Sequence, residues 1–103
     1  MLLASVSFRA QPHKRGEVLS AVDETAERMR QAEGCQRVRL LVDNEDPNAF
    51  TLASEWDSFV AAETFFASRE FQMFKGVRIL LREEPVVVFD DVRSRVTRLI
   101  RAR

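Results

Sequence analysis

Residues 34–56 read GCQRVRLLVDNEDPNAFTLASEW, and this stretch decides the fold. Side chains alternate in character along residues 35–43 and again along residues 50–56, which is the period of a β-strand. Residues 44–48 between them are rich in Asn, Asp and Pro, the composition of a turn. The two strands therefore predict a hairpin. Gly34 is a suitable end for a preceding helix, because glycine tolerates the left-handed conformation.

The residues before the hairpin predict a strand followed by a helix. Residues 2–10 alternate, and Pro12 ends the strand because proline cannot donate to a sheet. Residues 14–33 then change to the helical period. The apolar stripe of this helix comprises Val18, Val22, Thr25, Ala26 and Met29.

The residues after the hairpin predict a second helix and a last strand. Asp57 and Ser58 begin a helix that ends near Ala67. A strand is expected at residues 86–89, where β-branched residues dominate, while residues 77–81 fit a strand or a loop. A short helical piece between these elements carries Phe71, Met73 and Phe74 and stops near Gly76.

The last residues predict an amphipathic helix. Asp90 and Asp91 stand at its start and arginines toward its end, and both favour the helix dipole. Its apolar stripe comprises Val92, Val96, Leu99 and Ile100. Such a stripe should dock on a partner subunit or on its own domain.

The expected order is β-α-β-β-α-β with a helical tail, an α+β fold of the ferredoxin-like type with an antiparallel sheet. We divide the chain into one domain, residues 1–89, and a C-terminal amphipathic helical extension, residues 90–103. Helices cover one face of such a sheet, and here both faces carry apolar residues. A second copy of the chain is the simplest cover, so we expect a homodimer that closes into a dimeric α+β barrel.

The composition argues against some classes of function and favours one cellular compartment. Sixteen basic and sixteen acidic residues give a net charge of zero, which argues against a general nucleic-acid or membrane-surface binder. One cysteine excludes a disulfide within the chain and favours a reducing compartment. With no signal peptide or membrane span in the sequence, we expect the cytoplasm. Neither a metal-ligand spacing nor a phosphate-binding loop is present, so the sequence implies no metal and no cofactor.

Several short motifs in their order resemble the antibiotic biosynthesis monooxygenase family. They are the strand ending at Pro12, the pair Gly34-Cys35, the pair Glu55-Trp56, residues 66–71 and the valine-rich last strand. The resemblance covers residues 2–89. It implies a dimer with a pocket between each sheet and its helices. It also implies monooxygenases that oxidise phenolic polyketides or quinols without metal or flavin.

Two departures from the family matter. Haem-degrading relatives bind iron through a His nine residues after the Trp, and Phe65 occupies that position here. They also use an Asn on the first strand, where this chain has Ser7. Haem degradation is therefore not expected, and the chain also lacks the Tyr of some polyketide oxygenases.

The candidate pocket residues are Trp56, Phe59, Phe65, Phe66 and Ser7. The aromatic residues could line a pocket for a small aromatic ligand, or they could fill the helix–sheet core. Ser7 could donate a hydrogen bond to a ligand or simply lie on the sheet surface.

No catalytic residue is assigned. His13 has a suitable pKa for a base but is expected in a solvated turn. Cys35 is expected to be a small buried hydrophobe, and Glu55 a surface carboxylate. Two hypotheses remain, a cofactor-independent monooxygenase and a non-catalytic dimeric module that binds a small ligand or serves as a structural partner.

Overall fold

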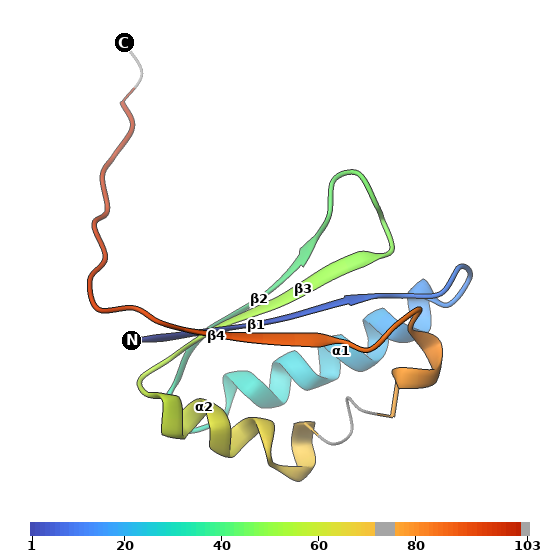
Figure 1. Cartoon of the computed structure of the whole chain (residues 1–103), viewed down its shortest axis with the longest axis horizontal. Helices are drawn as coiled ribbons and strands as arrows, with labels where there is room; N and C mark the ends of the chain where they lie inside the picture. The colour runs from blue at the N-terminus through green and yellow to red at the C-terminus, as the bar shows by residue number, and fades with distance from the viewer. Residues whose placement is uncertain (72–75, 102–103) are drawn as a thin grey trace.

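The computed structural model describes residues 1–71 and 76–101 of the 103-residue chain. A four-stranded sheet is covered on one face by two helices, and its other face is open (Figure 1). The strands lie in the order β2-β3-β1-β4 and every neighbouring pair is antiparallel. The ferredoxin-like α+β fold expected from the sequence is therefore confirmed. The elements are β1 (Leu2–Arg9), α1 (Arg15–Arg30), β2 (Cys35–Val42), β3 (Ala49–Trp56), α2 (Phe59–Phe66), the 3-10 turn η1 (Arg78–Leu80) and β4 (Val86–Asp91).

The core lies between the sheet and the helices. Strand β1 buries every second residue on this face, from Leu2 to Phe8, and β3 does the same from Phe50 to Trp56. The buried side of α1 consists of Val18, Val22, Thr25, Ala26 and Met29, the stripe expected from the sequence.

Two helix boundaries follow local rules. Ser58 precedes α2, and its hydroxyl accepts a hydrogen bond from the Ala61 N–H at 3.1 Å, as expected for an N-cap. Gly34 adopts a positive φ of 84° in the turn between α1 and β2. Its carbonyl accepts a hydrogen bond from the Asp57 N–H at 2.8 Å, which ties the start of β2 to the end of β3.

The ambiguous segment between α2 and β4 is not a full strand. Residues 69–71 are helical, whereas Met73 and Phe74 of the expected helical piece lie outside the described residues. Arg78–Leu80 form the 3-10 turn η1, and Leu81 makes an isolated bridge to Ala10.

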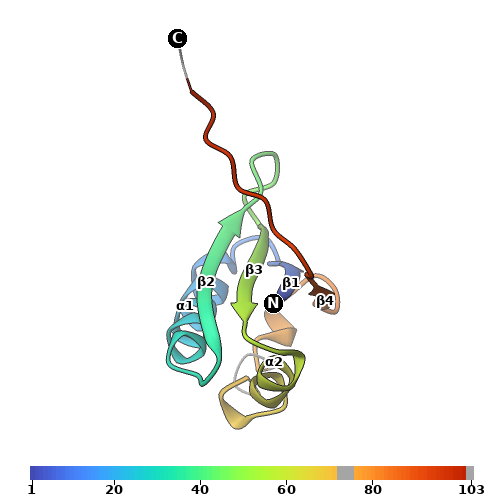
Figure 2. The same cartoon turned by 90° about the vertical axis from the view of Figure 1, so that its left-hand side faces the viewer.

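The expected C-terminal helix is wrong for the residues that the structure describes. Asp90 and Asp91 belong to β4, where they pair with Leu3 and Leu2 of β1. The Val92 N–H continues this ladder by donating to the Met1 carbonyl at 2.8 Å. The sheet thus uses the backbone groups that would form the first helical turn, and residues 92–101 contain no helix. This tail rises from the end of β4 on the open side of the sheet (Figures 1 and 2).

Candidate functional site

A cavity of about 470 Å³ lies on the helix side of the sheet, at the β4 edge. Strand residues Val6 and Val87, which are register partners on β1 and β4, lie on one side of it. The segment after α2 lies on the other. The described residues that line it are Val6, Phe71, Arg78, Leu81, Glu84, Pro85 and Val87.

The cavity exists because the helices do not cover β4 at Val87. Phe59 and Phe66 pack edge-on against Phe89, each with its ring centre 5.4 Å away, and cover that end of the strand. Val87 is the next residue of β4 on the same face, and its side chain stays 43% exposed. An apolar wall is thus left open to a ligand, which is the usual form of a small-molecule site.

Arg78 brings a positive charge to this apolar cavity. Its Nε lies 2.9 Å from Oε1 of Glu84, and its Nη1 donates to the Leu81 carbonyl at 3.4 Å. The contact with Glu84 is a close charge pair without hydrogen-bond alignment. Among the described residues, the buried Nε has no hydrogen-bond acceptor. This Nε is enclosed and faces Glu84, so a ligand would meet the exposed remainder of the guanidinium, whose side chain is 42% exposed.

Sequence reasoning missed both Arg78 and Glu84. The available signals were an arginine inside the apolar run of residues 77–81 and two acids directly before Pro85. These signals become meaningful only once the turn η1 and the start of β4 are known to face each other across a cavity.

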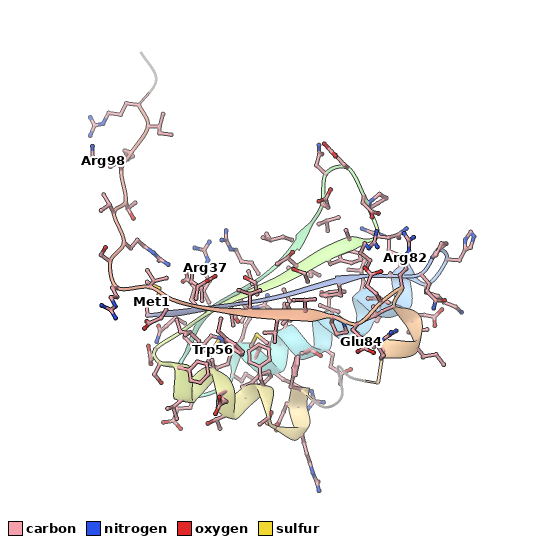
Figure 3. The ribbon with its side chains drawn as sticks, viewed as in Figure 1. Met1, Arg37, Trp56, Arg82, Glu84 and Arg98 are labelled. Atoms are coloured by element: carbon pink, nitrogen blue, oxygen red, sulfur yellow. The ribbon has the colours of Figure 1, made fainter. Side chains whose placement is uncertain are left out.

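Trp56 lies in the core and does not line the cavity. Its side chain is fully buried on the helix side of the sheet (Figure 3). The indole N–H donates to the Ser54 hydroxyl at 2.8 Å, and that hydroxyl donates to the Ala4 carbonyl at 3.2 Å. The donor expected to face a ligand is therefore engaged inside the core.

The phenylalanines form one connected cluster beside Trp56. The ring of Phe65 lies 5.7 Å from Trp56, and the ring of Phe66 lies 4.6 Å from Phe71. Phe65 and Trp56 are buried, and Phe59 is about half exposed where it covers Phe89. Most of the cluster fills the space between helix and sheet, and Phe71 extends it to the wall of the cavity.

Ser7 lies on the other side of the sheet. Its neighbours in register are Thr51 and Val86, and it is exposed on the open face. The structure therefore brings Trp56 and the phenylalanines together but separates Ser7 from them. Because the sheet lies between Ser7 and the four aromatic residues, the five candidates do not line one cavity.

The remaining candidate groups lie apart from the cavity. His13 is exposed in the turn after Pro12, with a positive φ of 71°. Glu55 pairs with Arg95 at 2.8 Å. Burial raises the pKa of the half-buried Cys35 thiol, which makes it a poor nucleophile. Within residues 1–71 and 76–101, no three His, Cys, Asp or Glu side chains gather as metal ligands would.

A larger groove of about 730 Å³ runs between the C-terminal end of α1 and the helix α2. Polar and charged side chains such as Arg28, Gln31 and Glu33 form much of its wall, and these are exposed. The smaller cavity is the better candidate, because it combines an apolar wall with one guanidinium, Arg78, and one carboxylate, Glu84.

Comparison with known proteins identifies a family for this arrangement. The family model described as antibiotic biosynthesis monooxygenase matches residues 1–76. A crystal structure named antibiotic biosynthesis monooxygenase is 27% identical and superimposes with a TM-score of 0.82 over 89% of this chain and 98% of that one. No protein with a curated description matches the sequence.

More distant structures share the fold. A protein of Deinococcus radiodurans, whose name places it in the same family, is 17% identical. It has a TM-score of 0.88 over 96% of this chain and 99% of that one. A protein of Mycobacterium tuberculosis is 16% identical, with a TM-score of 0.84 over 93% and 98% of the two chains. Within the described residues, no helix is long and apolar enough to cross a bilayer.

Proposed function

The chain belongs to the antibiotic biosynthesis monooxygenase family, and from that premise we propose that its cavity binds a small aromatic substrate of the quinol or polyketide type and supports its oxygenation without a bound cofactor. The family expected from the sequence is confirmed by the match. The substrate class and the reaction are our proposal.

The partly exposed guanidinium of Arg78 at the apolar cavity carries this proposal. A phenol bound against Val6, Val87 and Phe71 would bury its ring in the cavity. Its oxygen would accept a hydrogen bond from the exposed part of the Arg78 guanidinium. A guanidinium stabilises a phenolate over a phenol, so binding would favour the ionised, electron-rich form of the substrate.

Glu84 is our candidate for the proton acceptor. It is the one carboxylate among the described residues that line the cavity, and it lies beside Arg78. Deprotonation by Glu84 and stabilisation by Arg78 would act on the same oxygen.

The ionised substrate can then supply the electrons for O₂ reduction. In a substrate with a reactive CH₂ group, the substrate anion passes one electron to O₂, and the two radicals combine to a peroxide on carbon. Loss of water from that peroxide leaves a carbonyl group. One oxygen atom enters the product, and the other leaves as water with the two hydrogens of the oxidised carbon.

Oxygen uptake tests the proposal. Pure protein is incubated with a panel of anthrone- and quinol-type substrates, and the rate is compared with a protein-free control. Arg78→Met should lower kcat/KM on the order of 10- to 100-fold, because it removes the charge but keeps an apolar side chain. Arg82→Met is the matched control, since Arg82 is exposed near the same end of the sheet (Figure 3), and should change kcat/KM less than twofold. Uptake at background rate across the panel would overturn the oxygenase.

A ligand-binding module without catalysis is the second candidate. The observation that favours it is the use of the Trp56 N–H and most phenylalanine rings in core packing rather than at the cavity. Saturable binding of a panel compound that is lost in Arg78→Met, without O₂ uptake by the wild type, would identify this function.

We propose a second copy of the chain as the partner. Three large apolar side chains remain exposed on the open face of the sheet: Leu41 (45%), Val86 (58%) and Val88 (48%). Exposed apolar residues gathered on one face mark an interaction surface. Light scattering should give twice the 11.9 kDa chain mass at micromolar concentration, and a monomer would refute the dimer. The cytoplasmic location and the division at residue 89 stay predictions.

A further inference from the structure

The charges of this chain are distributed unevenly between the domain and the tail. Residues 92–103 contain five arginines and no acidic residue, whereas residues 1–91 contain eleven basic and sixteen acidic residues. The net charge of zero therefore consists of +5 on the last twelve residues and −5 on the rest of the chain. A balance of zero argues against a binder that uses its whole surface, but it does not describe this tail.

The described part of the tail, residues 92–101, leaves most of its positive charge without a partner. Arg95 pairs with Glu55 at 2.8 Å, which holds the beginning of the tail near β3. Arg93, Arg98 and Arg101 are exposed and form no ion pair with any described residue. Arg98 lies where the tail extends away from the sheet and the helices (Figure 3). These guanidinium groups can therefore bind anions outside the domain.

The same segment exposes large apolar side chains. Val96 is 77% exposed, Leu99 is 76% exposed and Ile100 is 99% exposed. An extended chain points Leu99 to one side and Val96 with Ile100 to the other, so these side chains do not share a surface. A helix would gather all three, together with Val92, within an arc of about 100°. The four arginines of residues 93–101 would lie at the borders of this arc or opposite it.

The domain does not offer the tail a surface on which this helix could pack. Most helical stability in proteins comes from packing of the apolar face, and a helix this short is marginal in water by itself. The β4 ladder ends where the Val92 N–H donates to the Met1 carbonyl. Residues 93–101 pair with no strand in the described part of the chain. An apolar layer outside the domain would therefore allow the helix to form.

An anionic phospholipid bilayer supplies such an apolar layer together with negative charge. The apolar face of a helix lying in the membrane surface is buried at the boundary of the acyl chains. The headgroups attract arginines, and each arginine near the surface strengthens binding about fivefold. Arginines at the borders of the apolar arc suit this position, because their long side chains reach the headgroups from it.

A nucleic acid fits the tail less well. It would neutralise the arginines but leave Val96, Leu99 and Ile100 in water. Residues 92–103 also contain no aromatic residue that could stack on bases. We propose that the tail binds the surface of an anionic phospholipid bilayer, where residues 93–101 form an amphipathic helix that holds the domain at the membrane. The tail rises from the β4 edge away from both helices, so the cavity on the helix side would stay accessible (Figures 1 and 2).

Cosedimentation of the full chain with sucrose-loaded vesicles tests the role of the charges. Vesicles of equimolar phosphatidylserine and phosphatidylcholine should bind the wild type, and vesicles of phosphatidylcholine alone should bind it at least about tenfold more weakly. Arg98→Gln with Arg101→Gln should lower the affinity for the anionic vesicles on the order of 30-fold. Arg69→Gln with Arg82→Gln, the same change at exposed arginines of the domain, should lower it less than about threefold.

A second pair of variants tests the apolar face at constant charge. Leu99→Ser with Ile100→Ser should lower the affinity for the anionic vesicles at least about tenfold, because it removes apolar area that the bilayer would bury. Val60→Ser with Ile79→Ser is the matched control, since both side chains are more than 70% exposed on the domain, and should leave the affinity unchanged. Far-UV circular dichroism should show added helix when the wild type meets anionic vesicles, and none for Leu99→Ser with Ile100→Ser.

The outcomes distinguish the bilayer from other partners of a basic tail. A wild type that binds no vesicles, or vesicle binding that the tail variants leave unchanged, overturns the proposal. Tight binding of a single-stranded oligonucleotide of mixed sequence, without vesicle binding, would assign the tail to nucleic acids instead. Sedimentation equilibrium without vesicles measures subunit association. If the Leu99→Ser, Ile100→Ser variant loses a dimer that the wild type forms, and the wild type binds no vesicles, the tail serves the second copy.

Discussion

Replacing Gly34 by alanine should cost more stability than any comparable change at a turn of this protein. Gly34 has a φ of 84°, where a side chain costs about 1–2 kcal/mol. A Cβ built there would lie 2.6 Å from the Cβ of Ala61 on α2, well inside van der Waals contact. Overpacking of this kind costs about 1–3 kcal/mol. The sum, about 2–5 kcal/mol, is a large part of the roughly 5–15 kcal/mol that stabilises a small domain.

Urea denaturation followed by Trp56 fluorescence measures this loss, because the chain has one tryptophan and it is fully buried. All variants are compared at one protein concentration, so that subunit association contributes equally. Gly16→Ala is the control. Nothing lies within 4 Å of a Cβ at Gly16 in α1, and the change should be neutral or gain up to about 1 kcal/mol.

A double-mutant cycle isolates the contact with α2. Ala61→Gly alone should cost about 1 kcal/mol in the helix. Combined with Gly34→Ala it removes the clash, so the two changes should couple favourably by about 1–3 kcal/mol. A Gly34→Ala variant within about 0.5 kcal/mol of the wild type, or a cycle without coupling, would refute the reasoning.

Three further experiments test other contacts. Ser54→Ala leaves the buried Trp56 N–H without its acceptor and should lower the free energy of unfolding by about 1–3 kcal/mol in the same urea assay. A loss near zero would contradict the hydrogen bond. Burial raises the pKa of Cys35, so a disulfide reagent should react more slowly than with free cysteine, at a rate still rising above about pH 8.5. Equal rates would count against this burial. Arg9 lowers the pKa of Glu83, so their pair stabilises the fold above the unfolded-state pKa, and this is lost as pH falls through the lower folded-state pKa. Glu83→Gln should therefore flatten the acid side of a Tm–pH profile, and an unchanged profile would disprove the pair's contribution.

The sequence predicted the elements whose burial repeats at a fixed period. The stripe of α1 and the alternation of β1 and β3 are read from neighbouring residues, and the structure buries the residues expected. The N-cap at Ser58 and the positive φ at Gly34 are equally local, because one side chain or its absence decides them.

The tail shows where such local patterns fail. Val92, Val96 and Ile100 lie four residues apart, a spacing that fits one face of a helix and also one side of a strand. The pairing of Asp90 and Asp91 with β1, far away in the sequence, makes these two residues the end of β4, and residues 92–101 after them contain no helix. A helix formed from the tail alone would also lack a packed face, from which most helical stability comes.

The candidate site could not be predicted from the sequence for a related reason. A cavity depends on where one layer ends above another, and nothing near Arg78 in the sequence shows that α2 stops over Phe89. The aromatic residues were conspicuous in the sequence because they are large. Size makes them good core residues, and Trp56 accordingly packs inside rather than at the cavity.

Strand β4 connects the two surfaces to which we assign a role. Its residues alternate, so that Val87 lines the cavity on the helix side while Val86 and Val88 lie on the open face. In the single chain β4 is an edge strand held by β1 alone. In the proposed dimer, a second copy packed against Val86 and Val88 would hold this strand from the open face and so fix the wall of the cavity. A variant that weakens the dimer on the open face, such as Val88→Asp, should therefore also weaken ligand binding, although Val88 lies on the opposite face of the sheet from the cavity. Binding that stays unchanged while the dimer dissociates would show that β1 alone keeps β4 in place.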